Sequence, residues 1–376
     1  MHPRAYEAIS EDQLEDIPDH THVIHAFALD TAKHLSVNGR YPGFLALPDR
    51  WISWWMAGVV RGLLAIRRKR PLVIWSTYPI ATAHLIGLTL HKLTGIPWVA
   101  DFRDSMTEDY YPKEARRRKV FLWIEQKTVE NCSRAVFTTP GAIRMYSARY
   151  PHIAAQKWVL IPNGYNEEIF LDAESNMEIR IPDSTPSNIV LVHSGVVYPS
   201  ERDPGPFFQA LANLKTEKAI SSEGLSVIMR ATGHDEYFQP MIDQLDINDI
   251  VQLAPGLPYR AALQEMLRAD GLLILQAANC NHQIPAKLYE YFRARRPILA
   301  LTDCEGDTAT TMLDAGIDSV APLDNTHDIS FRLRDFLQKI SRGDAPIASA
   351  QATLGASREH GAKRLANEFE RLLSSV

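Results

Sequence analysis

Short apolar runs, rich in β-branched residues, alternate with longer segments of helical periodicity along nearly the whole chain. The runs are apolar throughout rather than at every second position, which is typical of parallel strands buried on both faces. A first series of predicted strands covers residues 22–29, 72–77, 98–103, 135–139 and 158–164. A second series covers residues 188–195, 225–233, 250–256, 271–277, 297–302 and 319–323.

Because this alternation occurs twice, it predicts an α/β protein with two Rossmann-like, doubly wound parallel-sheet domains. A polar stretch with two prolines, LDAESNMEIRIPDSTPS, separates the two series of strands and places the boundary between Phe170 and Ser187. We therefore expect a first domain over residues 1–175 and a second over residues 186–350. A last helical segment, residues 352–376, could pack back on the first domain.

The beginning of the chain departs from this pattern. A doubly wound domain normally starts with an apolar strand and a glycine-bearing turn, but MHPRAYEAISEDQLEDIPDH contains neither. Either that element is truncated or the domain starts with its second strand, so the first domain is expected to lack its opening strand. The abundance of Glu and Asp in this segment also argues against a signal peptide.

Composition narrows the class of protein. A chain of 376 residues with 45% hydrophobic and 23% charged residues is typical of a globular protein with two cores. The apolar stretch 56–66 is interrupted by Arg61 and is too short to span a bilayer. The three cysteines show no CxxC spacing, which argues against a disulfide framework or a zinc site. These features predict a cytoplasmic protein.

The net charge of -5 conceals an asymmetry between the two halves. Residues 1–165 contain 21 Lys and Arg against 15 Asp and Glu, whereas the remainder contains 19 against 30. The basic half is either a solvated surface or one that meets an anionic partner. No nucleic-acid partner is expected.

Ligands of open α/β sheets bind outside the carboxyl ends of the strands, so polar residues at those ends are candidates for a site. In the first half, Thr77 and Tyr78, Thr139 and Asn163 lie at three such ends. Their hydroxyl and amide groups could hold a ligand, or they could simply cap turns and helices.

A denser group of charges follows the predicted strand 98–103. Asp101, Arg103 and Asp104 are costly to bury unpaired, so they form either a structural ion cluster or a site. The position at a strand end favours a site, in which a carboxylate could accept a proton from an attacking hydroxyl.

The second half carries the most informative segment, IPAKLYEYFRARRPILAL. This loop, helix and strand unit places Lys287 and Glu290 at the mouth of the second domain. An ammonium neutralises phosphate and a carboxylate accepts ribose hydroxyls, although both side chains could also be merely solvated. Gly195 would let the backbone approach a phosphate, and Arg202 could clamp it. Residues 306–308 offer a helix start as a second place for phosphate oxygens.

Residues 51–71 form an amphipathic segment that ends in the basic run RRKR. A stripe of this kind is usually core packing, and the alternative is a helix lying on anionic lipid. The predicted stripe consists of Trp51, Trp54, Trp55, Val59, Leu63 and Ile66.

The order of the motifs resembles that of bacterial glycosyltransferases of the GT-B fold, the family 4-like group that uses nucleotide sugars. The resemblance covers roughly residues 72–325. The carrying segments are IWSTYPIATAH, PWVADFRD, VFTTPG, LIPNGYNEEIF, HSGVVYPSERDP, PYRAALQEMLRADGLLIL and IPAKLYEYFRARRPIL. No GxGxxG follows any predicted strand, which disfavours a dehydrogenase.

The resemblance implies that the first domain binds the acceptor and the second binds the nucleotide sugar, with the reaction in the cleft between them. It implies that Glu290 holds the ribose and that Lys287 and Arg202 face the diphosphate. Gly306, Asp307 and Thr308 would lie near the phosphates and the sugar. It also implies retention of anomeric configuration and no requirement for a metal or another cofactor.

Two residues depart from the family pattern. His282 stands where the first Glu of the Glu-x7-Glu motif is expected, and it would then contact the donor sugar. Arg103, between two aspartates, stands where many relatives have a histidine. A catalytic base, if there is one, would then be Asp101 or Asp104.

The resulting hypothesis is a glycosyltransferase that moves a sugar from a nucleoside-diphosphate donor, with UDP as the expected nucleotide, to a glycan or lipid-linked acceptor in cell-surface polysaccharide synthesis. It would work in the cytoplasm, in peripheral contact with an anionic membrane at its inner face. The alternatives are a catalytically silent scaffold of the same fold and a nucleotide-sugar epimerase.

Overall fold

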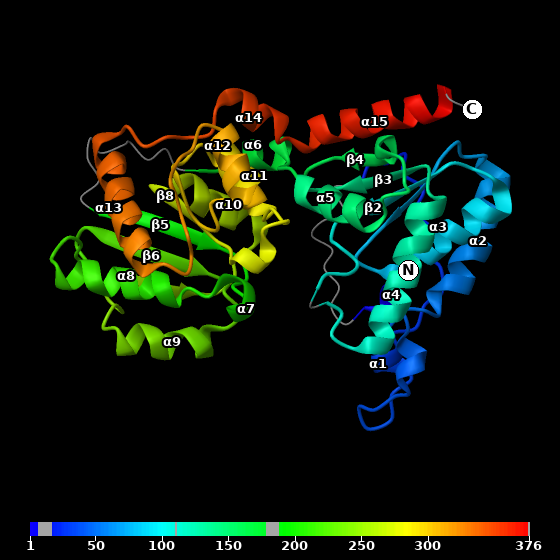
Figure 1. Ribbon diagram of the computed structural model, residues 1–376, viewed down its shortest axis with the longest axis horizontal. Helices are drawn as coiled ribbons and strands as arrows, with labels where there is room; N and C mark the ends of the chain where they lie inside the picture. The colour runs from blue at the N-terminus through cyan, green and yellow to red at the C-terminus, as the bar shows by residue number, and fades with distance from the viewer. Residues whose placement is uncertain (7–16, 110, 178–187, 375–376) are drawn as a thin grey trace. The chain divides into compact units, whose positions relative to one another are not determined.

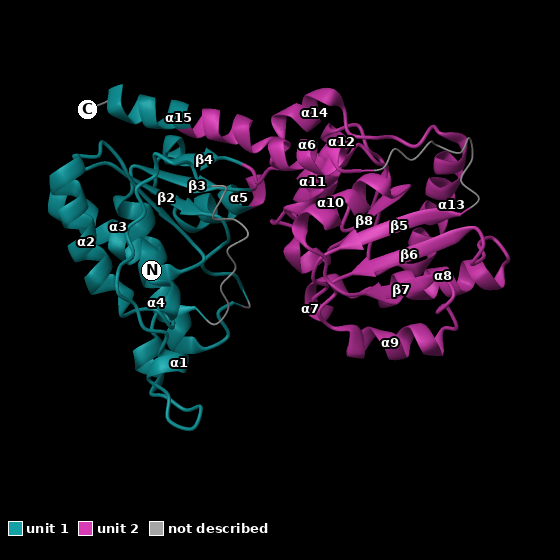
Figure 2. Ribbon diagram, turned by 180° about the vertical axis from the view of Figure 1, so that it is seen from behind, with its two compact units in different colours: residues 1–138, 142–161, 366–376 teal, residues 139–141, 162–365 magenta. Residues whose placement is uncertain are grey.

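The computed structural model describes residues 1–6, 17–109, 111–177 and 188–374 (Figure 1). The chain divides into two compact units (Figure 2). Unit 1 comprises residues 1–138, 142–161 and 366–376, and unit 2 comprises residues 139–141 and 162–365. Each unit has its own parallel sheet, which confirms the predicted α/β class with two Rossmann-like domains.

Unit 1 is built on four parallel strands in the order β1-β2-β3-β4. The strands are β1 (Ile74–Thr77), β2 (Trp98–Phe102), β3 (Arg134–Phe137) and β4 (Trp158–Leu160). The helices of this part of the chain are α1 (Thr31–His34), α2 (Trp54–Lys69), α3 (Ala81–Thr94), α4 (Ala115–Asn131) and α5 (Pro140–Arg149). All five residues of β2 are buried, as its continuous apolar run predicts.

One carboxylate lies inside the core of unit 1. Glu125 on α4 is fully buried and accepts hydrogen bonds from Thr107, Tyr146, Tyr150 and Arg149 at 2.6–2.8 Å. Four donors, one of them a guanidinium, replace the water that this carboxylate loses on folding. The cluster therefore ties α4 to α5 and to the loop after β2.

The predicted strand over residues 22–29 is wrong. This segment has no ladder partner, and the described residues before β1 contain only an isolated bridge between Val37 and Arg40. Val23 and Phe27 are exposed, while Ala26 and Ala28 are buried. The apolar residues thus cover the unit from outside the sheet, and β1 is the first strand of the described chain.

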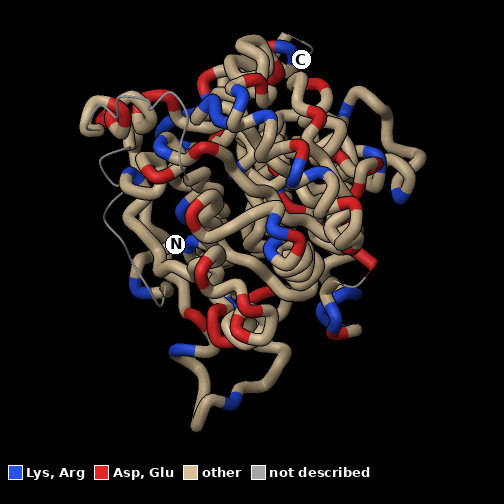
Figure 3. Tube along the Cα trace, turned by 90° about the vertical axis from the view of Figure 1, so that its left-hand side faces the viewer, with Lys and Arg blue, Asp and Glu red and all other residues tan. Residues whose placement is uncertain are grey.

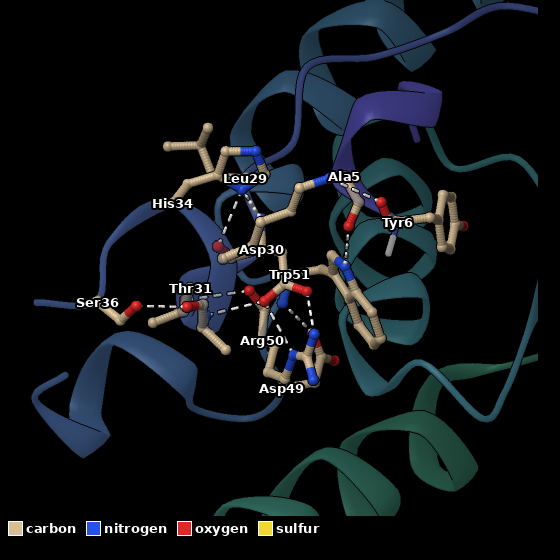
Figure 4. Close-up of polar contacts among 12 residues, drawn as sticks. Ala5, Tyr6, Leu29, Asp30, Thr31, His34, Ser36, Asp49, Arg50 and Trp51 are labelled. Carbon is tan, nitrogen blue, oxygen red and sulfur yellow. Dashed lines mark hydrogen bonds and ion pairs between the residues drawn. The ribbon is translucent and has the colours of Figure 1, made fainter. Parts of the chain in front are cut away.

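Side-chain hydrogen bonds hold this irregular region in place (Figure 4). Asp30 is fully buried, accepts from the backbone N–H of Ala32 at 2.9 Å and forms an ion pair with Arg50. Burial acts to raise the pKa of Asp30, but its hydrogen bonds with Arg50 and Ala32 outweigh burial and lower it. The indole of Trp51 donates to the carbonyl of Ala5 at 3.1 Å.

Unit 2 contains six parallel strands in the order β10-β9-β8-β5-β6-β7. They are β5 (Ile189–Ser194), β6 (Leu225–Arg230), β7 (Val251–Ala254), β8 (Gly271–Leu275), β9 (Ile298–Leu301) and β10 (Val320–Ala321). The order reverses between β5 and β8. A doubly wound sheet binds its ligand at such a switch point, outside the carboxyl ends of the strands.

Helices cover both faces of this sheet. The helices are α6 (Glu167–Ser175), α7 (Pro199–Arg202), α8 (Gly205–Thr216), α9 (Asp235–Gln244), α10 (Tyr259–Arg268), α11 (Lys287–Ala294), α12 (Asp307–Asp314), α13 (Thr326–Arg342) and α14 (Ala350–Gly355). Apolar residues of α8, α9 and α13 form one buried cluster with the sheet. Residues of α6, α10, α11, α12 and α14 form a second. Strands buried on both faces explain the continuous apolar runs.

The chain passes from unit 1 to unit 2 between Ile161 and Pro162. This is earlier than the predicted boundary, because α6 packs with unit 2. Residues 178–187, where the predicted linker continues, lie outside the described residues.

The last helix, α15 (Arg358–Ser374), contributes to both units. In unit 1, Glu368 forms an ion pair with Arg134 at 3.4 Å, and the ring of Phe369 packs edge-on against Trp75. Residues of both charge signs are interspersed along the trace (Figure 3). No helix in the described part of the chain is long and apolar enough to cross a membrane.

Candidate functional site

The predicted polar residues of unit 1 meet at the carboxyl ends of β1 and β2. The parallel register pairs Thr77 with Asp101, and the Thr77 hydroxyl donates to Asp101 Oδ2 at 2.9 Å. Arg103 and Asp104 follow on the same loop, and the carbonyl of Arg103 accepts from Thr138 at 2.9 Å. We call Thr77, Asp101, Arg103 and Asp104 the unit 1 cluster.

Both carboxyl groups of the unit 1 cluster are shifted toward the neutral form. Burial raises the pKa of Asp101 to about 6, against the opposing effects of the Thr77 hydroxyl and the Arg103 charge. Burial also raises the pKa of Asp104, which Arg103 again partly offsets. A carboxyl group with a pKa close to neutrality can both accept and release a proton, as a general base requires.

The other residues predicted for the acceptor side lie outside the strand-end pair of Thr77 and Asp101. Tyr78 is buried in the core of unit 1, with its ring stacked on His84. Burial first, then Tyr111 and the charge of Asp104, raise the pKa of Tyr78, so its hydroxyl interacts with one carboxylate of the unit 1 cluster. Thr139 and Asn163 belong to unit 2. The Thr139 hydroxyl donates to the carbonyl of His282 at 2.6 Å.

In unit 2, basic residues gather at the carboxyl end of β5, beside the switch point. Lys287 Nζ lies 3.2 Å from His193 Nε2. Gly195 has a φ of +109°, and a Cβ built on it would lie 3.2 Å from Lys287 Nζ. A glycine is therefore needed both for the backbone conformation and for open space beside the ammonium. We call His193, Gly195, Arg202, Lys287 and Glu290 the unit 2 cluster.

The hydrogen bonds of His193 define its protonation. Its Nδ1 donates to the carbonyl of Leu273 at 2.9 Å, which leaves Nε2 to accept from Lys287. Burial and then the Lys287 charge hold the pKa of His193 well below its usual range. Burial, followed by the charge of Arg202, lowers the pKa of Lys287 to about 7. Among the described residues, no carboxylate forms an ion pair with Lys287.

Glu290 lies one helical turn beyond Lys287. The hydroxyl of Tyr259, the first residue of α10, donates to Glu290 Oε1 at 2.7 Å. Burial raises the pKa of Glu290, while Tyr259 and the charges of Arg358 and Lys287 oppose this shift. Tyr291 reinforces the position of α11, because its hydroxyl accepts from the backbone N–H of Ser194 at 3.1 Å.

The remaining predicted residues have mostly structural contacts. Arg202 donates to the carbonyl of Val196 at 2.8 Å, beside the glycine turn. The buried side chain of Asp307 accepts from the N–H of Gly141 at 2.5 Å. The hydroxyl of Thr308 donates to Gln276 and is also buried.

Gly306 is the N-cap of α12, so the predicted helix start is present. A Cβ built on Gly141 would lie 2.6 Å from the Cα of His282, which leaves room there only for glycine. No group of three or more His, Cys, Asp or Glu residues in the described chain is arranged to hold a metal ion.

Comparison with known protein families and solved structures gives evidence that is independent of the geometry of the two clusters. Residues 20–164 match the model of the family described as glycosyl transferase 4-like domain. This part of the chain, which includes all four strands of unit 1, is thus similar to a glycosyl transferase 4-like domain. No curated protein sequence matches the chain.

Solved structures extend the comparison to both units. Sucrose-phosphate synthase from Thermosynechococcus elongatus is similar over 93% of this chain and 83% of its own, with a TM-score of 0.66 and 12% identity. A glycosyltransferase from Rickettsia africae is similar over 91% and 84%, with a TM-score of 0.61 and 10% identity.

A third similar structure is HepE of Anabaena in complex with UDP-glucose. It covers 85% of this chain and 82% of its own, with a TM-score of 0.59 and 12% identity. At these identities the likeness concerns the fold, which is that of GT-B glycosyltransferases. The predicted resemblance and fold are therefore confirmed.

Two residues in and beside the unit 2 cluster, His193 and Tyr259, are not among the predicted site residues. His193 is the buried next-to-last residue of β5, and its place at the end of an apolar strand is the only signal in the sequence. Tyr259 lies 31 residues before Glu290, and no spacing in the sequence links them.

Proposed function

We propose that the protein transfers a sugar from a nucleoside-diphosphate sugar, with UDP as the nucleotide, to a glycan or lipid-linked acceptor. The observation that carries this proposal is the unit 2 cluster. A lysine with a lowered pKa faces a glycine turn at the switch point of a doubly wound sheet, and it forms no ion pair with a carboxylate of the described residues. An anionic diphosphate would supply the missing charge.

The donor would contact unit 2 through a few groups. Lys287 and Arg202 would bind the diphosphate, and the free oxygen of Glu290 would accept hydrogen bonds from the ribose hydroxyls. Tyr259 occupies the other oxygen and fixes the orientation of the carboxylate. His282, Asp307 and Thr308, with the helix start at Gly306, would lie toward the sugar, as the family resemblance implies.

Unit 1 would supply the acceptor side of the reaction. The acceptor hydroxyl oxygen forms a bond to the anomeric carbon, the bond from that carbon to the diphosphate breaks, and the hydroxyl loses its proton. Asp101 is the first candidate to take up the proton, because its pKa of about 6 leaves it mostly ionised at neutral pH. Lys287 and Arg202 would stabilise the departing diphosphate. Retention of configuration, which the family resemblance implies, requires the hydroxyl to attack the face of the sugar from which the diphosphate departs. We expect this outcome and no metal requirement.

The proposed setting is cell-surface polysaccharide synthesis at the inner face of the plasma membrane. It is supported by the basic first half of the chain, which suits an acceptor held near anionic lipid. Recombinant protein incubated with UDP sugars and membrane extracts should release UDP only when the acceptor-containing extract is present.

A thermal-shift screen of UDP, GDP, ADP and CMP sugars identifies the donor, because a ligand that binds the native state raises the melting temperature. Consumption of a UDP sugar without an acceptor would favour an epimerase. Binding without turnover would favour a catalytically silent scaffold. Either result would refute the proposed transfer reaction.

A further inference from the structure

Helix α2 of unit 1 has one face packed and one face open. Gly58 and Gly62 face α3, where a Cβ on either would lie 2.5 Å from Ile86 Cδ1 or 2.7 Å from Leu90 Cδ1. The indole of Trp55 donates to the Thr89 hydroxyl of α3 at 3.0 Å. The two glycines therefore let α2 lie close against α3 (Figure 1).

The opposite face carries large apolar side chains. Met56, Val60 and Leu64 follow one another at intervals of four residues, which places them in a single stripe along the helix. Their exposed fractions are 68%, 54% and 45%. The sequence predicts a different stripe, centred on the tryptophans. In the structure those positions are more shielded than Met56, Val60 and Leu64.

Apart from Trp55, the remaining exposed residues of α2 are all cations, namely Arg61, Arg67, Arg68 and Lys69. Helix α2 contains no Asp or Glu. The helical spacing puts Arg67 in line with the apolar stripe, one turn beyond Leu64, and puts Arg61 and Arg68 along one side of it, whereas Lys69 lies on the opposite side of the helix. None of these four forms an ion pair with a described residue. A helix on an ordinary water-facing surface mixes both signs of charge with neutral polar groups.

We propose that the open face of α2 lies on an anionic lipid surface, with Met56, Val60 and Leu64 in the headgroup and acyl boundary. The flanking cations then meet lipid phosphates, and the helix axis lies in the plane of the membrane. Charge complementarity selects lipid over a second copy of this chain, because an identical face would oppose three arginines with three arginines. The inference rests on the proposed function in one respect: contact of α2 with the membrane is useful to the reaction because the proposed acceptor is held at that membrane.

The mode of binding determines how it responds to salt and to substitution. Phosphate contacts weaken as salt screens them, and each cation at the surface contributes about fivefold to partitioning. The triple variant R61Q/R67Q/R68Q should therefore bind anionic vesicles about 100-fold more weakly. The triple variant M56Q/V60Q/L64Q keeps every cation but removes the apolar stripe, and it should lose about tenfold or more.

Flotation of the full chain with phosphatidylcholine vesicles, with and without phosphatidylglycerol, tests the proposal. Binding should require phosphatidylglycerol, should disappear at about 1 M salt, and should fall in both triple variants. The double variant L313Q/F331Q removes two exposed apolar residues of unit 2 and should bind like the wild type. Circular dichroism should show that all variants remain folded.

Three results would overturn the proposal. They are binding that does not depend on the anionic lipid, equal binding by the wild type and both α2 variants, and no binding at all. Sedimentation velocity adds a further outcome: a dimer abolished by M56Q/V60Q/L64Q would assign this face to self-association instead. Since the assay contains no nucleotide, failure here leaves the proposed sugar transfer standing, and failure of the transferase assay leaves this contact standing.

Discussion

The lowered pKa of Lys287 makes a specific prediction about nucleotide binding. In the free protein, burial and the nearby Arg202 charge disfavour the ammonium, while Glu290 favours it, and the pKa is about 7. His193 adds no charge, since its own pKa is far below the usual value. A diphosphate placed beside Lys287 favours the charged form, so UDP should bind the protonated lysine and raise its pKa.

The size of the effect follows from the fraction of protonated lysine. With a pKa of about 7, this fraction falls about tenfold between pH 6 and pH 8, and the apparent affinity for UDP should fall with it. A charged hydrogen bond contributes about 1.5–3 kcal/mol, which limits the total loss to roughly 10- to 100-fold. Near pH 7, binding should take up about half a proton per protein.

The same pKa has a consequence for folding, with a defined sign. The pKa of Lys287 is lower in the folded protein than its usual 10.5, so folding releases a proton between these two values. Below pH 7 Lys287 is charged in the folded protein, so the full free-energy cost of burying its ammonium lowers the stability of the fold. Stability contributed by this residue should therefore rise as the pH increases from 7 to 10.5.

Isothermal titration calorimetry with UDP in buffers of different ionisation enthalpy measures both affinity and proton uptake. The variant Lys287→Met is the control, because it retains only the titration of the UDP phosphate itself. If wild type and Lys287→Met show the same pH dependence and the same proton uptake, Lys287 does not contact the diphosphate. Lower affinity in the variant without any difference in proton uptake would refute the assigned pKa.

Three further predictions concern individual side chains. Asp101→Asn should lower kcat far more than UDP affinity, and the kcat of the wild type should fall below about pH 6; equal losses in turnover and UDP binding would indicate a structural role. Tyr259→Phe should weaken UDP binding by about 0.5–1.5 kcal/mol, as measured by calorimetry, since Glu290 loses its orienting hydrogen bond; unchanged affinity would show that this bond is dispensable. Arg149→Met should destabilise unit 1 by about 3–5 kcal/mol in urea unfolding, because it leaves Glu125 buried without a cation, and a loss below about 1 kcal/mol would contradict that reasoning.

The parallel strands were predictable because strands that are buried on both faces appear in the sequence as continuous apolar runs. The run GLLIL of β8 is apolar and is buried at every position. Residues 22–29 show why the rule can fail. An apolar run can also cover a domain from outside, as the buried Ala26 and Ala28 do, and only the presence of a neighbouring strand distinguishes the two cases.

The candidate site was predictable where it depends on strand ends and not where it depends on side-chain direction. Thr77 and Asp101 meet because parallel strands bring their carboxyl ends to one edge. Tyr78 follows directly but points into the core, since successive residues of an extended chain point in opposite directions. The contact of Tyr259 with Glu290 joins α10 to α11, and no local pattern in the sequence predicts it.

The central claim is that unit 2 holds a nucleotide through the carboxylate of Glu290. Calorimetry of UDP binding to the wild type, Glu290→Ala and the control Glu236→Ala tests it directly, because Glu236 is an exposed acid of α9 in the same unit. Loss of the ribose contact should weaken binding to Glu290→Ala by about 1–3 kcal/mol, whereas Glu236→Ala should bind like the wild type. Equal UDP affinity in all three proteins would contradict the account.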